Sequence, residues 1–481
     1  MAESLKNKTI KGVTWSFLGS FSNQFLTLVF GIVLARLLAP SDYGLIALTY
    51  VFVAISNTFV DSGFSVALVR KEGVKECDYC TALFFNVIVA VFCYSVIFFI
   101  APYAASFYNN PLFCPVLRVV SLSVIINSLG TVQYVKYMRN IDFKRLSIMS
   151  IGSNLIGSLI GLVLAYLHYG VWALVFQTLT TTSLITCFYW TVSNWRPREH
   201  FSKESFLYLF GFGSKLLASG LLNVIFNNIY PIIIGKLFST SSLGFYSKAN
   251  NFARLPSSTF TEVMQKVTFP VLSKIQSDKE SLMTNYRKLI KISTFVVFPM
   301  MVGLSAIASP LILFLLTEKW AQSIVYLQII CFSMMWYPVH AINLNLLQVK
   351  GRSDLFLRLE IIKKIMAVIV IFCVVPFGVV GICWGSVFTS IVSLFINTYY
   401  TGKLINVGFV RQMKDIMPIL INSLIMGVSV HVLTRVVPSI TISLFLSIFC
   451  GFFIYVLLAH FSKSQELVEI VSIIKNKLRK I

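Results

Sequence analysis

Four basic residues lie where basic residues are costly, inside or at the ends of long apolar stretches: Arg118, Lys215, Lys248 and Arg254. If these stretches cross a bilayer, a charge at its centre costs about 2.5 to 3.5 kcal/mol even on the lenient insertion scale. Arginine can grip anionic oxygens with a bidentate fork, and lysine acts as a point charge. The four residues therefore favour binding of an anionic group such as phosphate or pyrophosphate.

Two of the four, Lys215 and Arg254, are the leading candidates, because the other two lie near the ends of their stretches, where a long side chain can reach the headgroups. Two carboxylates occupy comparable positions, Asp61 and Glu262, so a cavity that all these residues face would be net cationic. The carboxylates are either structural partners of the cations or sites of ion coupling, with H+ or Na+ as the candidate ion. The sequence leaves both alternatives open.

Polar residues recur three or four positions apart in three apolar stretches, a spacing that places them on one face of a helix. Because polar groups that face lipid are costly, such stripes predict a cavity lining, to which Asn23, Asn223, Asn227 and Asn250 would contribute beside the cations. For the neutral residues, hydrogen bonding between packed helices is an equally good explanation. The stripes are Ser16, Ser20, Asn23 and Thr27; Lys215, Ser219, Asn223 and Asn227; and Asn250, Arg254, Ser257 and Thr261.

The composition indicates the elements that position these residues. Hydrophobic residues make up 57% of the 481 residues and charged residues 12%, which is too little polar material to coat a soluble particle. A spanning helix needs about 20 apolar residues. We therefore predict an all-α polytopic membrane protein with about fourteen transmembrane helices, at 13–34, 43–66, 79–101, 115–135, 146–166, 171–190, 208–234, 245–268, 291–315, 324–348, 361–376, 379–400, 416–436 and 440–459.

The basic residues set the expected topology. A net charge of +22 in a soluble protein would suggest nucleic acid, but thirty-two of the forty Lys and Arg residues fall in, or within a few residues of, every second gap between apolar stretches. The intervening gaps hold only Arg36, Lys236, Lys319 and Arg435. By the positive-inside rule the basic gaps are cytoplasmic, so both termini are expected in the cytoplasm and no nucleic acid is expected as a partner.

An internal repeat organises the chain. A shift of 200 residues aligns Asn23 with Asn223, Arg36 with Lys236 and Gly44 with Gly244, among other matches. An even number of helices separates the copies, so both have the same orientation in the membrane. We predict two parallel six-helix lobes around a central cavity, in residues 1–202 and 203–402. A C-terminal helix pair and a cytoplasmic tail, in residues 403–481, have no counterpart in the repeat.

Prolines interrupt the seventh to tenth predicted helices. A proline inside a helix removes a backbone hydrogen bond and clashes with the preceding turn. Kinks or unwound turns, which could serve as hinges, are expected at Pro231, Pro256, Pro299, Pro310 and Pro338.

The motifs of several enzyme classes are missing from the sequence. Gly235-Lys236 and Gly402-Lys403 are both followed by Leu, so no nucleotide-hydrolysing P-loop is present. The single CxxC pair, Cys77 and Cys80, has no second pair, and we interpret it as chance spacing rather than a metal site. The outer loops are too short for a glycosyl-transferring site. We therefore expect no catalytic residue, no metal and no cofactor.

Several segments carry a family resemblance. The stretch Leu34–Gly44, which reads LARLLAPSDYG, and Asp61–Phe64, which reads DSGF, resemble the opening of the polysaccharide transporter family of the multidrug/oligosaccharidyl-lipid/polysaccharide exporter superfamily. Wzx-type flippases belong to this family. IGKLF at 234–238, LGFY at 243–246 and LQVKGR at 347–352 are also similar to it. One departure is that family members often carry an acid just before the IGK segment, where this chain has Tyr230-Pro231.

The resemblance implies translocation of undecaprenyl-pyrophosphate-linked oligosaccharide repeat units, for O-antigen, capsule or exopolysaccharide, across the bacterial inner membrane by alternating access. Membrane lipids and the polysaccharide polymerase machinery are the other expected partners. A multidrug cation antiporter of the same superfamily is the first alternative, although it predicts an acidic cavity. A membrane polymerase or ligase of the same pathway is the second, and a structural scaffold is the third.

Overall fold

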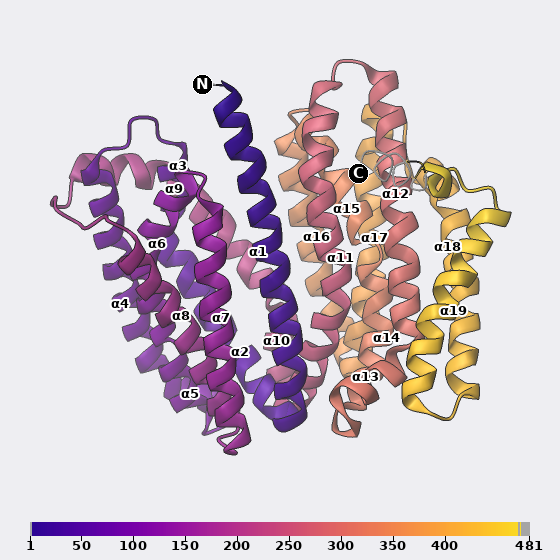
Figure 1. Cartoon of the computed structure of the whole chain (residues 1–481), viewed down its shortest axis with the longest axis horizontal. Helices are drawn as coiled ribbons and strands as arrows, with labels where there is room; N and C mark the ends of the chain where they lie inside the picture. The colour runs from indigo at the N-terminus through magenta and orange to yellow at the C-terminus, as the bar shows by residue number, and fades with distance from the viewer. Residues whose placement is uncertain (1, 470–471, 473–481) are drawn as a thin grey trace. The chain divides into compact units, whose positions relative to one another are not determined.

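The computed structural model of the chain describes residues 2–469 and residue 472. In these residues the secondary structure consists of α-helices and two short 3-10 helices, without any strand (Figure 1). The helices gather into two compact units, Met1–Gly244 and Phe245–Ile481. The prediction of an all-α protein is confirmed.

In the first unit, α7 packs against α1 and α8, while α6 packs against α4 and α8. Helix α9 packs against α2, α3 and α4, and this contact places it in the first unit although the repeat groups it with later residues. A buried core that includes Phe64, Leu68 and Leu209 joins α3 and α9. The elements are α1 (Ala2–Leu37), α2 (Pro40–Asp61), α3 (Phe64–Arg70), α4 (Glu76–Phe107), α5 (Phe113–Val120), α6 (Leu122–Arg139), α7 (Phe143–Tyr166), α8 (Val171–Val192), α9 (Lys203–Asn227), α10 (Ile229–Leu237) and the start of α11 (Thr240–Lys274).

In the second unit, α12 packs against α14 and α18, and α17 packs against α14 and α16. Helix α19 packs against α18 and α13, so the C-terminal helix pair is part of this unit. The elements after α11 are α12 (Lys279–Ala306), α13 (Ala308–Leu316), η1 (Glu318–Trp320), α14 (Gln322–Met334), α15 (Tyr337–Val349), α16 (Ser353–Val374), η2 (Val375–Phe377), α17 (Gly378–Ile405), α18 (Phe409–Val436) and α19 (Ile440–Phe461).

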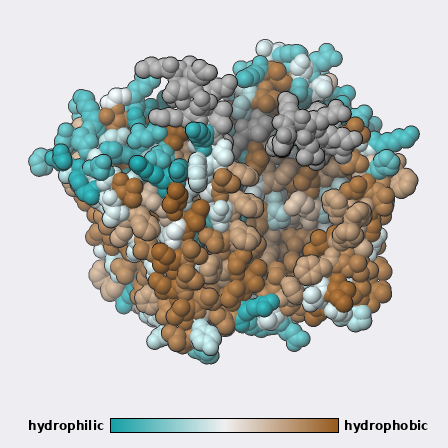
Figure 2. Space-filling view, viewed as in Figure 1, coloured by the Kyte–Doolittle hydropathy of each residue, from teal (hydrophilic) through white to brown (hydrophobic). Residues whose placement is uncertain are grey.

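Twelve stretches of the described residues form helices long and apolar enough to cross a membrane. One of them, Ser353–Ile405, comprises both α16 and α17, and α11, which carries Lys248, Arg254 and Glu262, is not among the twelve. On the face that Figure 2 shows, hydrophobic residues cover the middle of the helices in each unit and hydrophilic residues gather at the helix ends. The chain is a multi-pass membrane protein. The count of fourteen spans and the lobe boundaries at 202 and 402 stay predictions.

Helices break just before three of the five prolines. The interruptions fall at Asn228, at Ile307 and at Met335–Trp336, two or three residues before Pro231, Pro310 and Pro338. The cause is that a proline cannot donate to the carbonyl four residues earlier, and its ring clashes with that carbonyl. Helices α11 and α12 continue as helix through Pro256 and Pro299, where no unwound turn occurs.

Among the described residues, three carbonyls that lie four residues before a proline of a helix accept a hydrogen bond from a side chain of another helix. Pro102 lies inside α4, so the Phe98 carbonyl has no backbone N–H partner, and Arg118 Nε of α5 donates to it at 3.1 Å. An unpaired backbone group in hydrocarbon costs several kcal/mol, so these donors stabilise the broken turns. The other two pairs are Tyr455 Oη to the Phe295 carbonyl at 2.9 Å, before Pro299, and Ser257 Oγ to the Met334 carbonyl at 2.7 Å, before Pro338.

Candidate functional site

The predicted stripe on α9 is an exposed face of the first unit. Lys215, Ser219, Asn223 and Asn227 are all exposed there. In the described part of the chain, Lys215 has neither a hydrogen bond nor an ion pair within the protein. The ammonium group is therefore available to a ligand.

The stripe on α11 divides into an exposed half and a buried half. Arg254 is exposed and has no ion pair among the described residues, and Asn250 is half-buried. Ser257 and Thr261 are buried: Ser257 donates to the Met334 carbonyl, and Thr261 Oγ1 donates to the Ser257 carbonyl at 2.7 Å. Only the N-terminal half of this stripe can meet a ligand.

Asn23 on α1 is part of a packed helix contact. Its Nδ2 donates to Ser150 Oγ at 3.0 Å, and its Oδ1 accepts from Asn154 Nδ2 at 3.3 Å, both on α7. Thr27 Oγ1 accepts from the same Asn154 amide at 3.3 Å. Helix-to-helix hydrogen bonding, one of the two explanations that the sequence leaves open, therefore describes Asn23 and Thr27 of this stripe.

Lys248 is the most enclosed of the four cations, with 9% of its surface exposed. Its Nζ lies 5.8 Å from the ring centroid of Trp320, which is itself fully buried. Phe245 packs edge-on against the same indole. The structure thus places Lys248 in an aromatic setting, as it places Arg118 against Phe98.

The two carboxylates differ in their surroundings. Asp61 ends α2, and its Oδ1 accepts hydrogen bonds from the backbone N–H and the hydroxyl of Ser65, in the first turn of α3. Glu262 is exposed on α11. In the part of the chain that the structure describes, neither one forms an ion pair with an embedded cation. Asp61 is occupied in joining two helices, whereas Glu262 is exposed and has no ion pair among the described residues.

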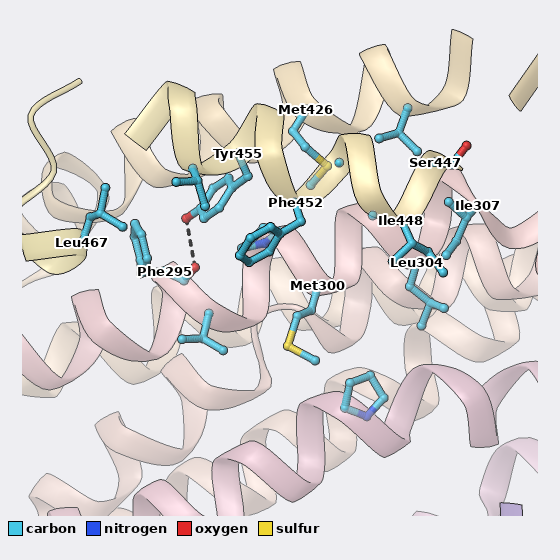
Figure 3. Close-up of a pocket in the computed structure, with 17 residues that line it drawn as sticks. Phe295, Met300, Leu304, Ile307, Met426, Ser447, Ile448, Phe452, Tyr455 and Leu467 are labelled. Atoms are coloured by element: carbon cyan, nitrogen blue, oxygen red, sulfur yellow. Dashed lines mark hydrogen bonds between the residues drawn. The ribbon is translucent and has the colours of Figure 1, made fainter. Parts of the chain in front are cut away.

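An apolar pocket of about 730 Å3 in the second unit has no counterpart in the sequence analysis. Phe295, Met300 and Leu304 of α12 face Ile448 and Phe452 of α19 across it, as Figure 3 shows. Met426 of α18 and Pro256 of α11 complete the wall. The hydrogen bond from Tyr455 to the Phe295 carbonyl crosses one end. The pocket gives α18 and α19 a structural role, as walls of an apolar site.

Ion pairs hold the short segment after α19 against the basic end of α12. Leu467 of this segment lines the pocket, and the flanking residues Glu466 and Glu469 pair with Lys291 at 3.8 Å and with Lys288 at 2.9 Å. Lys291 also lies 3.7 Å from Asp415 of α18. This charged cluster holds the segment that contributes Leu467 to the pocket.

Comparison with known proteins places the chain in a family. A family model described as polysaccharide biosynthesis protein matches residues 33–325. The chain belongs to this family. The segment that the family model matches ends before α18 and α19 begin, so two walls of the apolar pocket lie outside the matched segment.

Two relatives and one solved structure resemble this polysaccharide biosynthesis protein over most of its length. The lipopolysaccharide biosynthesis protein WzxC of Escherichia coli (strain K12) is 23% identical, over 85% of this chain and 84% of that protein. The succinoglycan biosynthesis transport protein ExoT of Rhizobium meliloti (strain 1021) is 27% identical, over 67% of this chain and 66% of that protein. The lipid II flippase MurJ in an inward closed conformation superposes with a TM-score of 0.75 at 15% identity, over 93% of this chain and 98% of that chain. The likeness to MurJ shows the fold, and the family resemblance seen in the sequence is confirmed.

Proposed function

We propose that this polysaccharide biosynthesis protein is a flippase that moves undecaprenyl-pyrophosphate-linked oligosaccharide repeat units across the bacterial inner membrane. Support comes from relatives named for lipopolysaccharide biosynthesis and succinoglycan transport, and from a structural neighbour named a lipid II flippase. The observation that carries the proposal lies on α11, where the exposed Arg254 is within one helical turn of Pro256, which lines the apolar pocket. A polyprenyl pyrophosphate combines the two matching chemistries, an anionic head and an apolar chain, in one molecule.

The physical task is to carry a pyrophosphate and its sugars across about 30 Å of hydrocarbon, which such polar groups do not cross unaided. Lys215 and Arg254 would bind the pyrophosphate, and Asn223, Asn227 and Asn250 would hydrogen-bond the sugars. The polyprenyl chain would occupy the apolar pocket. With the cytoplasm negative, outward movement of the anion is favoured by about 2.3 kcal/mol per charge for each 100 mV.

A coupled ion would add to this driving force. Glu262 is the better candidate for carrying H+ or Na+, because it is exposed on α11 two turns from Arg254, whereas Asp61 is bound to Ser65. The proposal describes a transporter with both termini in the cytoplasm, which hands its product to a polysaccharide polymerase.

The test uses cells in which the double variant Lys215→Ala/Arg254→Ala is the only copy of this protein. The measurement is the side of the membrane on which the lipid-linked glycan lies. Charge-assisted hydrogen bonds predict a fall of about tenfold or more in surface polysaccharide, with the glycan retained on the cytoplasmic side. Arg435→Ala, at the exposed end of α18, is the matched control and should export normally. Normal export with lost drug resistance would instead support an antiporter. Unpolymerised units on the outer side would support a polymerase or ligase.

A further inference from the structure

A second, smaller pocket lies in the first unit between α4 and α5. Its volume is about 330 Å3, within the range of about 300 to 1,000 Å3 that is usual for small-ligand sites. Arg118 supplies the only charge among its lining residues, which include no carboxylate. The apolar wall consists of Tyr94 and Phe98 on α4, Pro115 and Val119 on α5, and Leu122 at the start of α6.

The pocket opens to the apolar outside of the helices. Phe98 is 38% exposed and Leu122 is 36% exposed, and the neighbouring Phe99 and Tyr103 are more exposed still. Since α4 is a membrane span, an exposed face this rich in aromatic residues faces lipid. Arg118 therefore stands at the boundary between protein and lipid, at the end of the unit where α4 turns into α5 (Figure 1).

The contacts of Arg118 leave its charge uncompensated. Nε donates to the Phe98 carbonyl, and the guanidinium carbon lies 3.9 Å from the Phe98 ring centroid. Both partners fix the orientation of the side chain, but neither carries a formal charge. Among the described residues the two Nη groups donate to nothing, and no carboxylate pairs with them. A guanidinium held in this way can donate hydrogen bonds from both Nη groups to an anion.

We propose that this pocket binds the phosphate of an anionic phospholipid, held by the Nη groups of Arg118, with an acyl chain against Phe98 and Leu122. Basic pockets between transmembrane helices are suited to such headgroups because they combine a positive charge with an apolar wall. This pocket shares no residue with the larger apolar pocket or with the stripes on α9 and α11, and the proposal does not depend on the proposed function. Its ligand is a membrane lipid rather than cargo.

Arg118 also supports the turn that Pro102 breaks, so the experiment must separate the two roles. In Pro102→Ala, the backbone N–H of residue 102 can donate to the Phe98 carbonyl, and Arg118 is no longer needed there. The variants to compare are the parent, Arg118→Gln, Pro102→Ala, the double variant Pro102→Ala/Arg118→Gln, and Arg435→Gln as the matched loss of one exposed arginine.

The measurement is native mass spectrometry of the purified full chain with equimolar phosphatidylglycerol and phosphatidylcholine, together with its thermal unfolding. We expect the parent, Pro102→Ala and Arg435→Gln to retain phosphatidylglycerol preferentially, and both Arg118→Gln variants to retain about tenfold less. The double variant should unfold at the temperature of Pro102→Ala, so its lipid loss is not a loss of folding. Equal retention by the double variant and Pro102→Ala, or no preference for phosphatidylglycerol in the parent, would overturn the proposal. Arg118-dependent retention of farnesyl pyrophosphate in place of phosphatidylglycerol would make this a cargo site and would also overturn it.

Discussion

Gly44 and Gly244, which are related by the 200-residue repeat, pack directly against each other's chain segment. A Cβ added to Gly44 would lie 1.7 Å from the Thr240 carbonyl oxygen, and one added to Gly244 would lie 1.8 Å from the Pro40 carbonyl oxygen. Pro40 and Thr240 are themselves 200 residues apart, so the contact is symmetric under the repeat. The start of α2 and the start of α11 approach each other this closely because neither glycine has a side chain.

Alanine at either glycine should therefore push the two helix starts apart. We expect Gly44→Ala and Gly244→Ala each to cost about 1 to 3 kcal/mol through overpacking against backbone atoms that have no room to move. The measurement is thermal unfolding of the purified protein. Gly211→Ala is the control, because a Cβ at Gly211 of α9 meets nothing within 4 Å. If all three variants unfold at the same temperature, the close contact does not contribute to stability.

The hydroxyl of Tyr455 should matter only while Pro299 is present. Tyr455→Phe leaves the Phe295 carbonyl without a donor in an apolar setting, which costs about 1 to 3 kcal/mol. In Pro299→Ala the backbone N–H of residue 299 can take over, so the same Tyr→Phe change should then cost little. A double-mutant cycle on unfolding free energies measures this coupling. Additive effects would contradict the assignment, and Tyr166→Phe, which is exposed on α7, serves as a neutral control.

A polar side chain in the wall of the apolar pocket should weaken binding of an apolar ligand there. Met300 lines the pocket and is 46% exposed, so its replacement is compatible with folding. If the pocket holds a polyprenyl chain, Met300→Gln should weaken binding of a polyprenyl phosphate by about fivefold, because an amide loses solvation there. Met300→Leu should bind as the parent does. Indistinguishable binding by the two variants would show that the chain lies elsewhere.

The ion pair of Asp415 with Arg287 should stabilise the second unit more than an exposed pair does. Asp415 is 8% exposed, and its two oxygens accept from Arg287 Nε and Nη2 at 2.7 Å each. We expect Asp415→Asn to cost about 1 to 3 kcal/mol, against about 0 to 1 for Asp354→Asn, whose pair with Arg352 is exposed. Chemical denaturation of both variants checks the ranking, and the reverse order would refute it.

Asp278 should make the stability of α12 depend on pH. Hydrogen bonds from the Ser281 side chain, and from the backbone N–H groups of Ser281 and Glu280, lower the pKa of this carboxyl below its ordinary value of 3.8. A lowered pKa in the folded state means that the stabilisation is present above the unfolded-state pKa and is lost as pH falls through the folded-state pKa. In thermal unfolding at pH 7, Asp278→Ala should therefore unfold at a lower temperature than the parent. This difference in unfolding temperature should shrink below about pH 4. A difference that stays constant down to pH 2 would rule out the carboxylate as the cause.

Part of the candidate site could be predicted because it depends on one helix at a time. The spacing of Lys215, Ser219, Asn223 and Asn227 predicts a single face, and the structure exposes that face. The same spacing on α1 did not indicate the neighbour of Asn23, which is Asn154 of α7, 131 residues away in the chain. A stripe in the sequence has the same form whether it faces a cavity or another helix.

The sequence alone predicted the membrane class, the all-α fold and the family, because hydropathy, charge and motif are properties of short segments. It also located three helix breaks, since a proline acts on its own preceding turn. The three-dimensional structure was needed to show which donors satisfy the carbonyls before Pro102, Pro299 and Pro338, and which cations are free. It also revealed the apolar pocket, because its lining residues have the same composition as those that face lipid. Such features arise from contacts between residues far apart in the chain, which no single segment encodes.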